Sequence, residues 1–335
     1  MPRNSVCPVY IAQTMDAFIR EQIAGYGGKR HRVGALDMRK YPKLIRVRIC
    51  GGQVALEMSR GPMLGRDAYI RTVVEQLLAR HAVADTVFLV NMADGYTYLD
   101  DTPVFNYAVP GGKRGLVFPN FDLYVPRAKA AGGVMDFDQT KHECKQYSPD
   151  PDSVALDLYF KGNCTSKSRS AIRERLSREP HPFNVTASND YSEPVFKIKD
   201  HKYALDLCGA KPQSLRLKYL FMMSRVVIRV SFFNPAIGET SHWRQWYDPI
   251  FEPGVDYVHL QYAFDYDAAI PDKIYAAVKR DVLAVRTHFE ARPRAYAAMV
   301  ASLDAKRRRL TLNSTFRYLR DLLERYTAEV LDAEP

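Results

Sequence analysis

Alternating apolar and polar positions mark the strands of this chain, and apolar positions three or four residues apart mark its helices. Residues 43–58 alternate on both sides of a Gly-Gly pair, which predicts a β-hairpin. Residues 70–78 carry apolar side chains at helical spacing, which predicts an amphipathic helix. A continuous apolar run at 86–91 predicts a buried strand, and shorter apolar runs follow at 103–107 and 115–119.

The second half of the chain shows the same alternation of strands and helices. Residues 154–160 predict a strand, and residues 167–176 predict a basic helix. The clearest unit follows: an alternating strand at 201–207, a turn with Gly and Pro, and good helix formers at 214–223. The β-branched run at 225–230 is typical of a strand buried in a parallel sheet.

Strands that alternate with helices in both halves predict an α/β fold, with two parallel-sheet domains facing each other across a cleft. The segment 129–152 is rich in Gly, Pro and charge and has no periodicity, so we place the domain boundary near its end. Residues 1–152 would form an N-terminal Rossmann-like domain, joined by the C-terminal helix at 312–332, whose apolar stripe is clear. Residues 153–311 would form a C-terminal Rossmann-like domain.

Composition narrows the function classes. Among 335 residues, 47% are apolar and 26% are charged, which excludes a disordered chain. The net charge of +10 suits an anionic partner, such as nucleic acid, a membrane surface or a sugar nucleotide. Basic groups occur at 29–32 and 306–309, and we interpret the second as a solvated helix end. Charge alone does not choose among these partners.

The cysteines and the apolar runs indicate a compartment. Five widely spaced cysteines without a C-x-x-C pair indicate neither a zinc site nor a disulfide framework, so a reducing compartment is the simplest setting. Residues 1–14 have no signal-peptide core, and no run is long enough to span a membrane. We therefore expect a cytoplasmic protein without a membrane span.

Polar side chains follow several predicted strands, where ligands of parallel sheets bind. Asp94, Asn163 and Ser214 each come just after a predicted strand. A carboxylate there can serve as a general base, and the guanidinium groups of Arg169 and Arg216 can grip phosphate. The alternative interpretations are a turn Asp and solvated arginines.

Other polar residues have simpler explanations. Asn163 and Thr165 can act as helix caps. We interpret His201 as structural and the pair Asp100-Asp101 as part of a loop.

Four ordered segments are similar to one known family. They are residues 87–94 with 103–105 and 118–119, residues 160–169, residues 201–227 and residues 252–258. Together they resemble glycosyltransferase family 90, which contains the Rumi-like protein O-glucosyl/O-xylosyltransferases and the capsule-associated xylosyltransferases. The ordered set is far more specific than any single segment.

The resemblance implies a two-domain glycosyltransferase B-type fold and an inverting, metal-independent transfer from a UDP-sugar, without a cofactor. It implies that Asp94 is the catalytic base that deprotonates the acceptor hydroxyl. It also implies a set of donor-binding residues: Asn163, Thr165, Arg169, Gln213, Ser214 and Arg216. The donor sugar would be xylose or glucose, and the acceptor a glycan or glycoconjugate.

Two other hypotheses remain open from the sequence. A non-catalytic relative that binds a glycan or a protein is suggested by the altered loop at 160–169, where Lys161, Asn163 and Cys164 replace the residues of the family motif. A nucleic-acid-binding protein is suggested by the net charge, but no nucleic-acid partner is expected because the basic run at 306–309 lacks interleaved aromatic residues.

Overall fold

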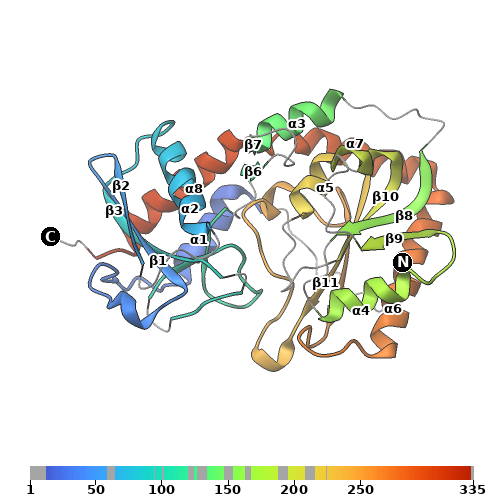
Figure 1. Cartoon of the computed structure of the whole chain (residues 1–335), viewed down its shortest axis with the longest axis horizontal. Coiled ribbons are helices and arrows are strands. Elements are labelled where there is room, and N and C mark those ends of the chain that lie inside the picture. Colours follow the sequence, from blue (N-terminus) through green and yellow to red (C-terminus); the bar gives the residue numbers. More distant parts are fainter. Residues whose placement is uncertain are drawn as a thin grey trace. The chain divides into compact units, whose positions relative to one another are not determined.

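The chain has a mixed α/β fold with two separate five-stranded sheets, each in its own compact unit. The computed structural model describes residues 13–58, 65–93, 95–99, 102–119, 124–126, 134–146, 154–162, 167–187, 195–207, 216–223 and 225–332 (Figure 1). The first unit comprises Gln13–Tyr124, Arg244–Pro249 and Thr311–Pro335. The second unit comprises Val125–Trp243 and Ile250–Leu310.

The first unit is built on a mixed sheet with the strand order β2-β1-β3-β4-β5. Its helices and strands are α1 (Met15–Ala24), η1 (Met38–Lys40), β1 (Leu44–Cys50), β2 (Gln53–Met58), α2 (Arg66–Leu78), β3 (Thr86–Asn91), β4 (Val104–Asn106), β5 (Leu116–Val117) and α8 (Leu312–Glu329). Strands β3, β4 and β5 run parallel, whereas β1 is antiparallel to both β2 and β3.

The hairpin predicted at 43–58 is confirmed, and it makes the first sheet mixed, with parallel strands at β3, β4 and β5 only. Gly51 and Gly52 connect β1 to β2 with φ angles of 56° and 73°. Positive φ at both central residues is the geometry of a tight two-residue hairpin turn, which glycine adopts without strain. A turn this short leaves no room for a crossover, so β1 and β2 must be antiparallel.

The last helix completes the core of the first unit. Helix α8 begins with a capping box, in which the Thr311 side chain accepts from Ser314 N and the Ser314 hydroxyl accepts from Thr311 N. Its apolar stripe is buried, as the sequence predicts. At its far end, the Tyr326 hydroxyl donates to the Val87 carbonyl on β3 at 3.1 Å. Tyr326 also packs edge-on against Phe105 on β4.

The second unit is built on a fully parallel sheet with the strand order β12-β11-β10-β8-β9. Its helices and strands are α3 (Phe137–Gln146), β8 (Ala155–Gly162), α4 (Lys167–Leu176), β9 (Phe183–Ala187), η4 (Val195–Asp200), β10 (His201–Leu207), α5 (Leu217–Met223), β11 (Val226–Phe233), η5 (Pro235–Ile237), β12 (Val258–Ala263), α6 (Asp272–Glu290) and α7 (Pro293–Arg307). Strands β6 (Tyr124–Pro126) and β7 (Val134–Asp136) form a separate ribbon. The short helix η6 (Asp248–Ile250) has its first two residues assigned to the first unit and its last residue to the second.

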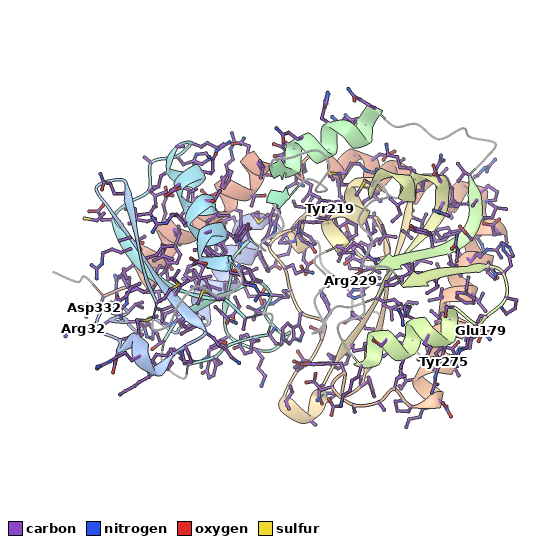
Figure 2. The ribbon with its side chains drawn as sticks, in the orientation of Figure 1. Arg32, Glu179, Tyr219, Arg229, Tyr275 and Asp332 are labelled. Atoms are coloured by element: carbon purple, nitrogen blue, oxygen red, sulfur yellow. The ribbon has the colours of Figure 1, made fainter. Side chains whose placement is uncertain are left out.

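Helices cover both faces of the second sheet, as a parallel sheet requires. Figure 1 shows α4 and α6 on one side of this sheet and α5 and α7 on the other. Glu179, which follows α4, accepts hydrogen bonds from Tyr275 at 2.8 Å and from Lys279 at 2.6 Å, both on α6 (Figure 2). On the opposite side, Arg307 at the end of α7 donates to the Met222 carbonyl on α5 at 3.0 Å.

A buried lysine caps helix α7. Lys141 Nζ on α3 donates to the carbonyls of Arg307, Arg308 and Leu310 at 2.9, 3.3 and 2.8 Å. The last carbonyls of a helix have no partner within the helix and carry the negative end of its dipole, so a cation stabilises them. Desolvation by burial lowers the pKa of Lys141.

Candidate functional site

The second sheet has a topological switch point between β8 and β10. In chain order its five strands are arranged 2-1-3-4-5, with β8 as the first strand and β10 as the third. The two strands are parallel neighbours, with Tyr203 opposite Leu158. From β8 the chain crosses through α4 to β9, and from β10 it crosses through α5 to β11 on the other side. Where two such connections diverge, a crevice opens at the carboxyl ends of the strands, and ligands of doubly wound sheets bind there.

All six predicted donor-binding residues follow one of these two strands in the chain. Asn163, Thr165 and Arg169 come after β8, and Gln213, Ser214 and Arg216 come after β10. Of the six side chains, the structure describes that of Arg216. Asn163, Thr165, Gln213 and Ser214 lie outside the described residues. Arg169 lies within α4, but its side chain is outside the described part.

Arg216 is held at the carboxyl end of β10. Its Nη2 donates to the Leu205 carbonyl at 2.9 Å and lies 3.7 Å from the Asp206 carboxylate. Its guanidinium carbon lies 4.3 Å from the centre of the Phe160 ring, which belongs to β8. The side chain is 22% exposed. A positive charge is therefore positioned at the ends of both switch-point strands, in contact with an aromatic face that favours a cation.

A row of polar residues, two of them buried, crosses the sheet beside Arg216. The register pairs Asp206 on β10 with Arg229 on β11, and Arg229 with His259 on β12. Asp206 and Arg229 are each 1% exposed. Buried charges are costly unless opposite charges or hydrogen bonds compensate them, and the row places an acid beside a base. The β-branched run at 225–230 predicted a buried strand but not this row. Arg229 is a single arginine within that run, and its partners lie on other strands. Figure 2 shows Arg229 within the second unit.

His259 extends this row toward the edge of the sheet. Its Nε2 lies 2.7 Å from the Ser231 hydroxyl, and its ring lies 4.6 Å from the ring of His242. Burial lowers the pKa of His259 well below its ordinary value, and the nearby His242 and Arg229 lower it further. His259 is therefore neutral at physiological pH.

His201 lies at the opposite end of β10 from the switch point. Its Nδ1 lies 2.6 Å from the Asp157 carboxylate, and its ring stacks on Tyr159 at 3.9 Å. Asn184 donates to the other oxygen of Asp157 at 2.7 Å. Burial opposes ionisation of Asp157, but the hydrogen bonds from His201 and Asn184 outweigh it and lower its pKa. These contacts join β8, β9 and β10 and agree with a structural role for His201.

The predicted base Asp94 lies outside the described residues, as do Asp100 and Asp101. The described residues before and after it are linked by hydrogen bonds of Asn91. Asn91, the last residue of β3, accepts from Ala93 N at 2.9 Å and donates to the Gly95 carbonyl at 2.6 Å. It also donates to Asn106 on β4 at 2.9 Å, and both asparagines are fully buried. The sequence signal for this network is the pair of asparagines at the ends of β3 and β4, Asn91 and Asn106.

The basic group at 306–309 is not a uniformly solvated helix end, so that interpretation is wrong for its first half. Lys306 forms an ion pair with the buried Asp256 at 2.6 Å, and Arg307 donates to the Met222 carbonyl. Arg308 and Arg309 are exposed. Contacts from α5 and from the loop before β12 draw the first two side chains inward, which helical spacing alone does not indicate.

The other basic group anchors the C-terminal segment. His31 N donates to the Val330 carbonyl at 2.9 Å, and Asp332 N donates to the His31 carbonyl at 3.0 Å. Arg30 donates to the Leu331 carbonyl at 2.8 Å, and Arg32 forms an ion pair with Asp332 at 2.8 Å (Figure 2). Arg30 and Arg32 thus bind the C-terminal segment of the same chain. The net charge therefore overstates the number of cations that are available to bind an anionic partner.

Comparison with known proteins leaves the family open. No protein-family model matches the chain, and no curated protein matches it.

In the described ranges, no helix combines the length and the apolar character needed to cross a membrane. Within the same ranges, no three His, Cys, Asp or Glu side chains are grouped as a metal ion would require.

Proposed function

We propose that this protein is an inverting glycosyltransferase that transfers a sugar, xylose or glucose, from a UDP-sugar to a hydroxyl of a glycan or glycoconjugate. The observation that carries the proposal is the position of Arg216 at the switch point between β8 and β10. Four ordered segments, which include Phe160 and Arg216, resemble glycosyltransferase family 90, and this resemblance also supports the proposal. In this proposal the two units correspond to the two domains of a glycosyltransferase B-type fold, and the protein acts in the cytoplasm.

In this proposal the second unit binds the donor. Arg216 contacts the diphosphate, and the surrounding contacts come from Asn163, Thr165, Arg169, Gln213 and Ser214. The contacts of Arg216 with Leu205 and Asp206 fix the direction of its guanidinium before the ligand binds. A cation that is oriented in advance loses less conformational entropy on binding than a mobile one.

The reaction then needs one base and one stabilised leaving group. Asp94 takes the proton of the acceptor hydroxyl, whose oxygen attacks the anomeric carbon from the side opposite UDP. The bond between the anomeric carbon and the diphosphate oxygen breaks, and negative charge develops on UDP. The guanidinium of Arg216 stabilises that charge in the transition state, as preorganised donors do in other transfer reactions. Inversion at the anomeric carbon follows from this single displacement.

Thermal stability in the presence of ligands tests the proposal. A ligand that binds only the native state raises its melting temperature. We expect UDP, UDP-xylose and UDP-glucose to raise it with or without EDTA, and GDP-mannose and a short DNA duplex to leave it unchanged. Failure of every UDP species to stabilise the protein would contradict a donor site, and stabilisation by DNA alone would favour a nucleic-acid-binding protein.

A further inference from the structure

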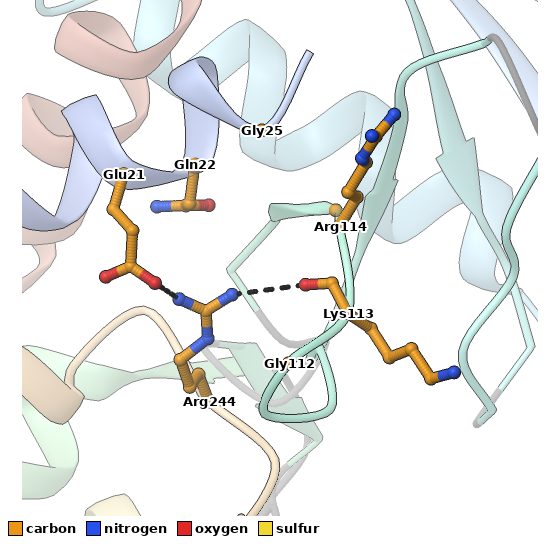
Figure 3. Close-up of a pocket in the computed structure, with 8 residues that line it drawn as sticks. Glu21, Gln22, Gly25, Gly112, Lys113, Arg114 and Arg244 are labelled. Atoms are coloured by element: carbon orange, nitrogen blue, oxygen red, sulfur yellow. Dashed lines mark hydrogen bonds and ion pairs between the residues drawn. The ribbon is translucent and has the colours of Figure 1, made fainter. Parts of the chain in front are cut away.

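The first unit contains a small pocket whose wall is rich in positive charge (Figure 3). It has a volume of about 240 Å³ and lies between the end of α1, the loop that precedes β5, and Arg244. The loop contributes Gly112, Lys113 and Arg114, and α1 contributes Glu21. All of these residues belong to the first unit, whereas the switch-point strands β8 and β10 belong to the second.

Arg244 is fixed in the pocket wall. Its backbone N donates to the Val109 carbonyl at 2.8 Å, and Val109 N donates to its carbonyl at 3.0 Å. Its guanidinium forms an ion pair with Glu21 and donates to the Lys113 carbonyl at 3.5 Å. The side chain is 17% exposed. Arg244 is therefore held in the pocket wall by hydrogen bonds of its backbone and by contacts of its guanidinium.

Lys113 and Arg114 add two cations at the rim. Figure 3 shows both side chains extending from the loop away from Arg244. Among the described residues, neither forms an ion pair with a carboxylate. Three cations and the one carboxylate of Glu21 give the pocket lining a net charge of +2. Long side chains of this kind can turn toward a ligand without any change in the backbone.

The backbone of the loop is constrained around these cations. Gly112 has a φ angle of 80°, which favours glycine. A Cβ at Gly115 would lie 2.8 Å from Val109 Cγ2, closer than packed atoms allow. The loop thus presents its cations from a defined backbone.

We propose that this pocket binds the phosphate group of a small phosphorylated molecule. A dianion compensates the net charge of +2, whereas a carboxylate compensates half of it. Guanidinium groups match the geometry of phosphate oxygens, and the volume accommodates a phosphate with a small organic group. This binding does not depend on the proposed transfer reaction.

Calorimetric titration with inorganic phosphate at constant ionic strength tests the site. We expect saturable binding at millimolar phosphate, and at least a tenfold loss of affinity in the double variant Lys113→Gln/Arg114→Gln. Both substitutions are on the rim, so this variant should fold, whereas Arg244→Gln removes contacts that anchor the wall. Arg48→Gln, an exposed charge change in the same unit, should bind phosphate as the wild type does.

The remaining variants separate this site from the proposed donor site. Arg216→Lys should retain phosphate binding in the pocket, and the double variant should retain any stabilisation by UDP. Equal phosphate affinity in the wild type and the double variant would overturn the proposal. Acetate binding as tight as phosphate binding would overturn the assignment of a dianion, and an absence of saturable phosphate binding would remove the site.

Discussion

The guanidinium carbon of Arg216 lies 4.3 Å from the centre of the Phe160 ring, so the residue before α5 contacts the neighbouring strand β8. This contact joins the two strands whose connections diverge. A planar guanidinium can stack on an aromatic ring while its edge donates hydrogen bonds, but an ammonium group cannot do both equally well.

The substitution Arg216→Lys should therefore weaken UDP binding by about tenfold while keeping the charge. The reason is that lysine retains the attraction to phosphate but loses the planar donor geometry and the contact of the guanidinium with the Phe160 ring. Calorimetric titration with UDP measures the effect. Arg178→Lys, an exposed position after α4, is the matched control and should bind UDP normally. Unchanged affinity in Arg216→Lys would mean that the diphosphate does not contact this side chain.

Asp94→Asn should reduce sugar transfer by about 100-fold or more and leave UDP affinity nearly unchanged, because loss of a general base has effects of that size. The amide has the same shape but cannot accept a proton. Transfer rates with a UDP-sugar and UDP titration separate the two effects. Asp304→Asn on α7 is an exposed control that removes the same charge. Equal rates in Asp94→Asn and the wild type would remove Asp94 from the mechanism.

Lys141→Met should lower the free energy of unfolding by about 2 kcal/mol, because the carbonyls at the end of α7 lose a charged hydrogen-bond donor. Urea denaturation measures this loss. Lys145→Met lies on the same helix at an exposed position and should change the stability by less than about 0.5 kcal/mol. Similar effects of the two substitutions would show that the cap contributes little.

Acidification should destabilise the protein through His259. Its pKa is lower in the folded state than in the unfolded state, where it is about 6.5, so the unfolded chain binds the extra proton below that pH. Stability from this residue is thus present above about pH 6.5 and is lost as pH falls, with a limiting slope of about 1.4 kcal/mol per pH unit. Urea denaturation at pH 7.5 and at pH 5.5 should show a smaller loss in His259→Gln than in the wild type. An equal loss in both would assign the effect to other groups.

Gly115→Ala should destabilise the protein by about 1–3 kcal/mol, because the added methyl group overlaps the Val109 side chain and forces the loop to move. Thermal or urea denaturation measures the change. Gly95→Ala is the control, since a Cβ at that position would meet nothing within 4 Å. A stable Gly115→Ala variant would show that the loop shifts at low cost.

Local pattern was sufficient to predict most of the regular elements. The Gly-Gly pair predicted the hairpin of β1 and β2, the apolar stripe predicted α8, and the β-branched run predicted β11. Each of these signals acts within a few residues, because helical and strand periods and turn geometry are local properties. The first sheet is parallel at β3, β4 and β5 and antiparallel at β1, where the short turn of the predicted hairpin sets the strand direction.

The sequence by itself determined which polar residues follow the predicted strands. Arg216 is one of these residues, and the strand order was not needed to identify it. Only the tertiary structure decided that β8 lies beside β10, and that Arg216 therefore contacts Phe160 as well as Asp206. It also decided that Lys306 and Arg307 turn inward, and that Arg244 closes a pocket with α1. The physical reason is that strand order and side-chain partners depend on packing between segments far apart in the chain, which no local periodicity encodes.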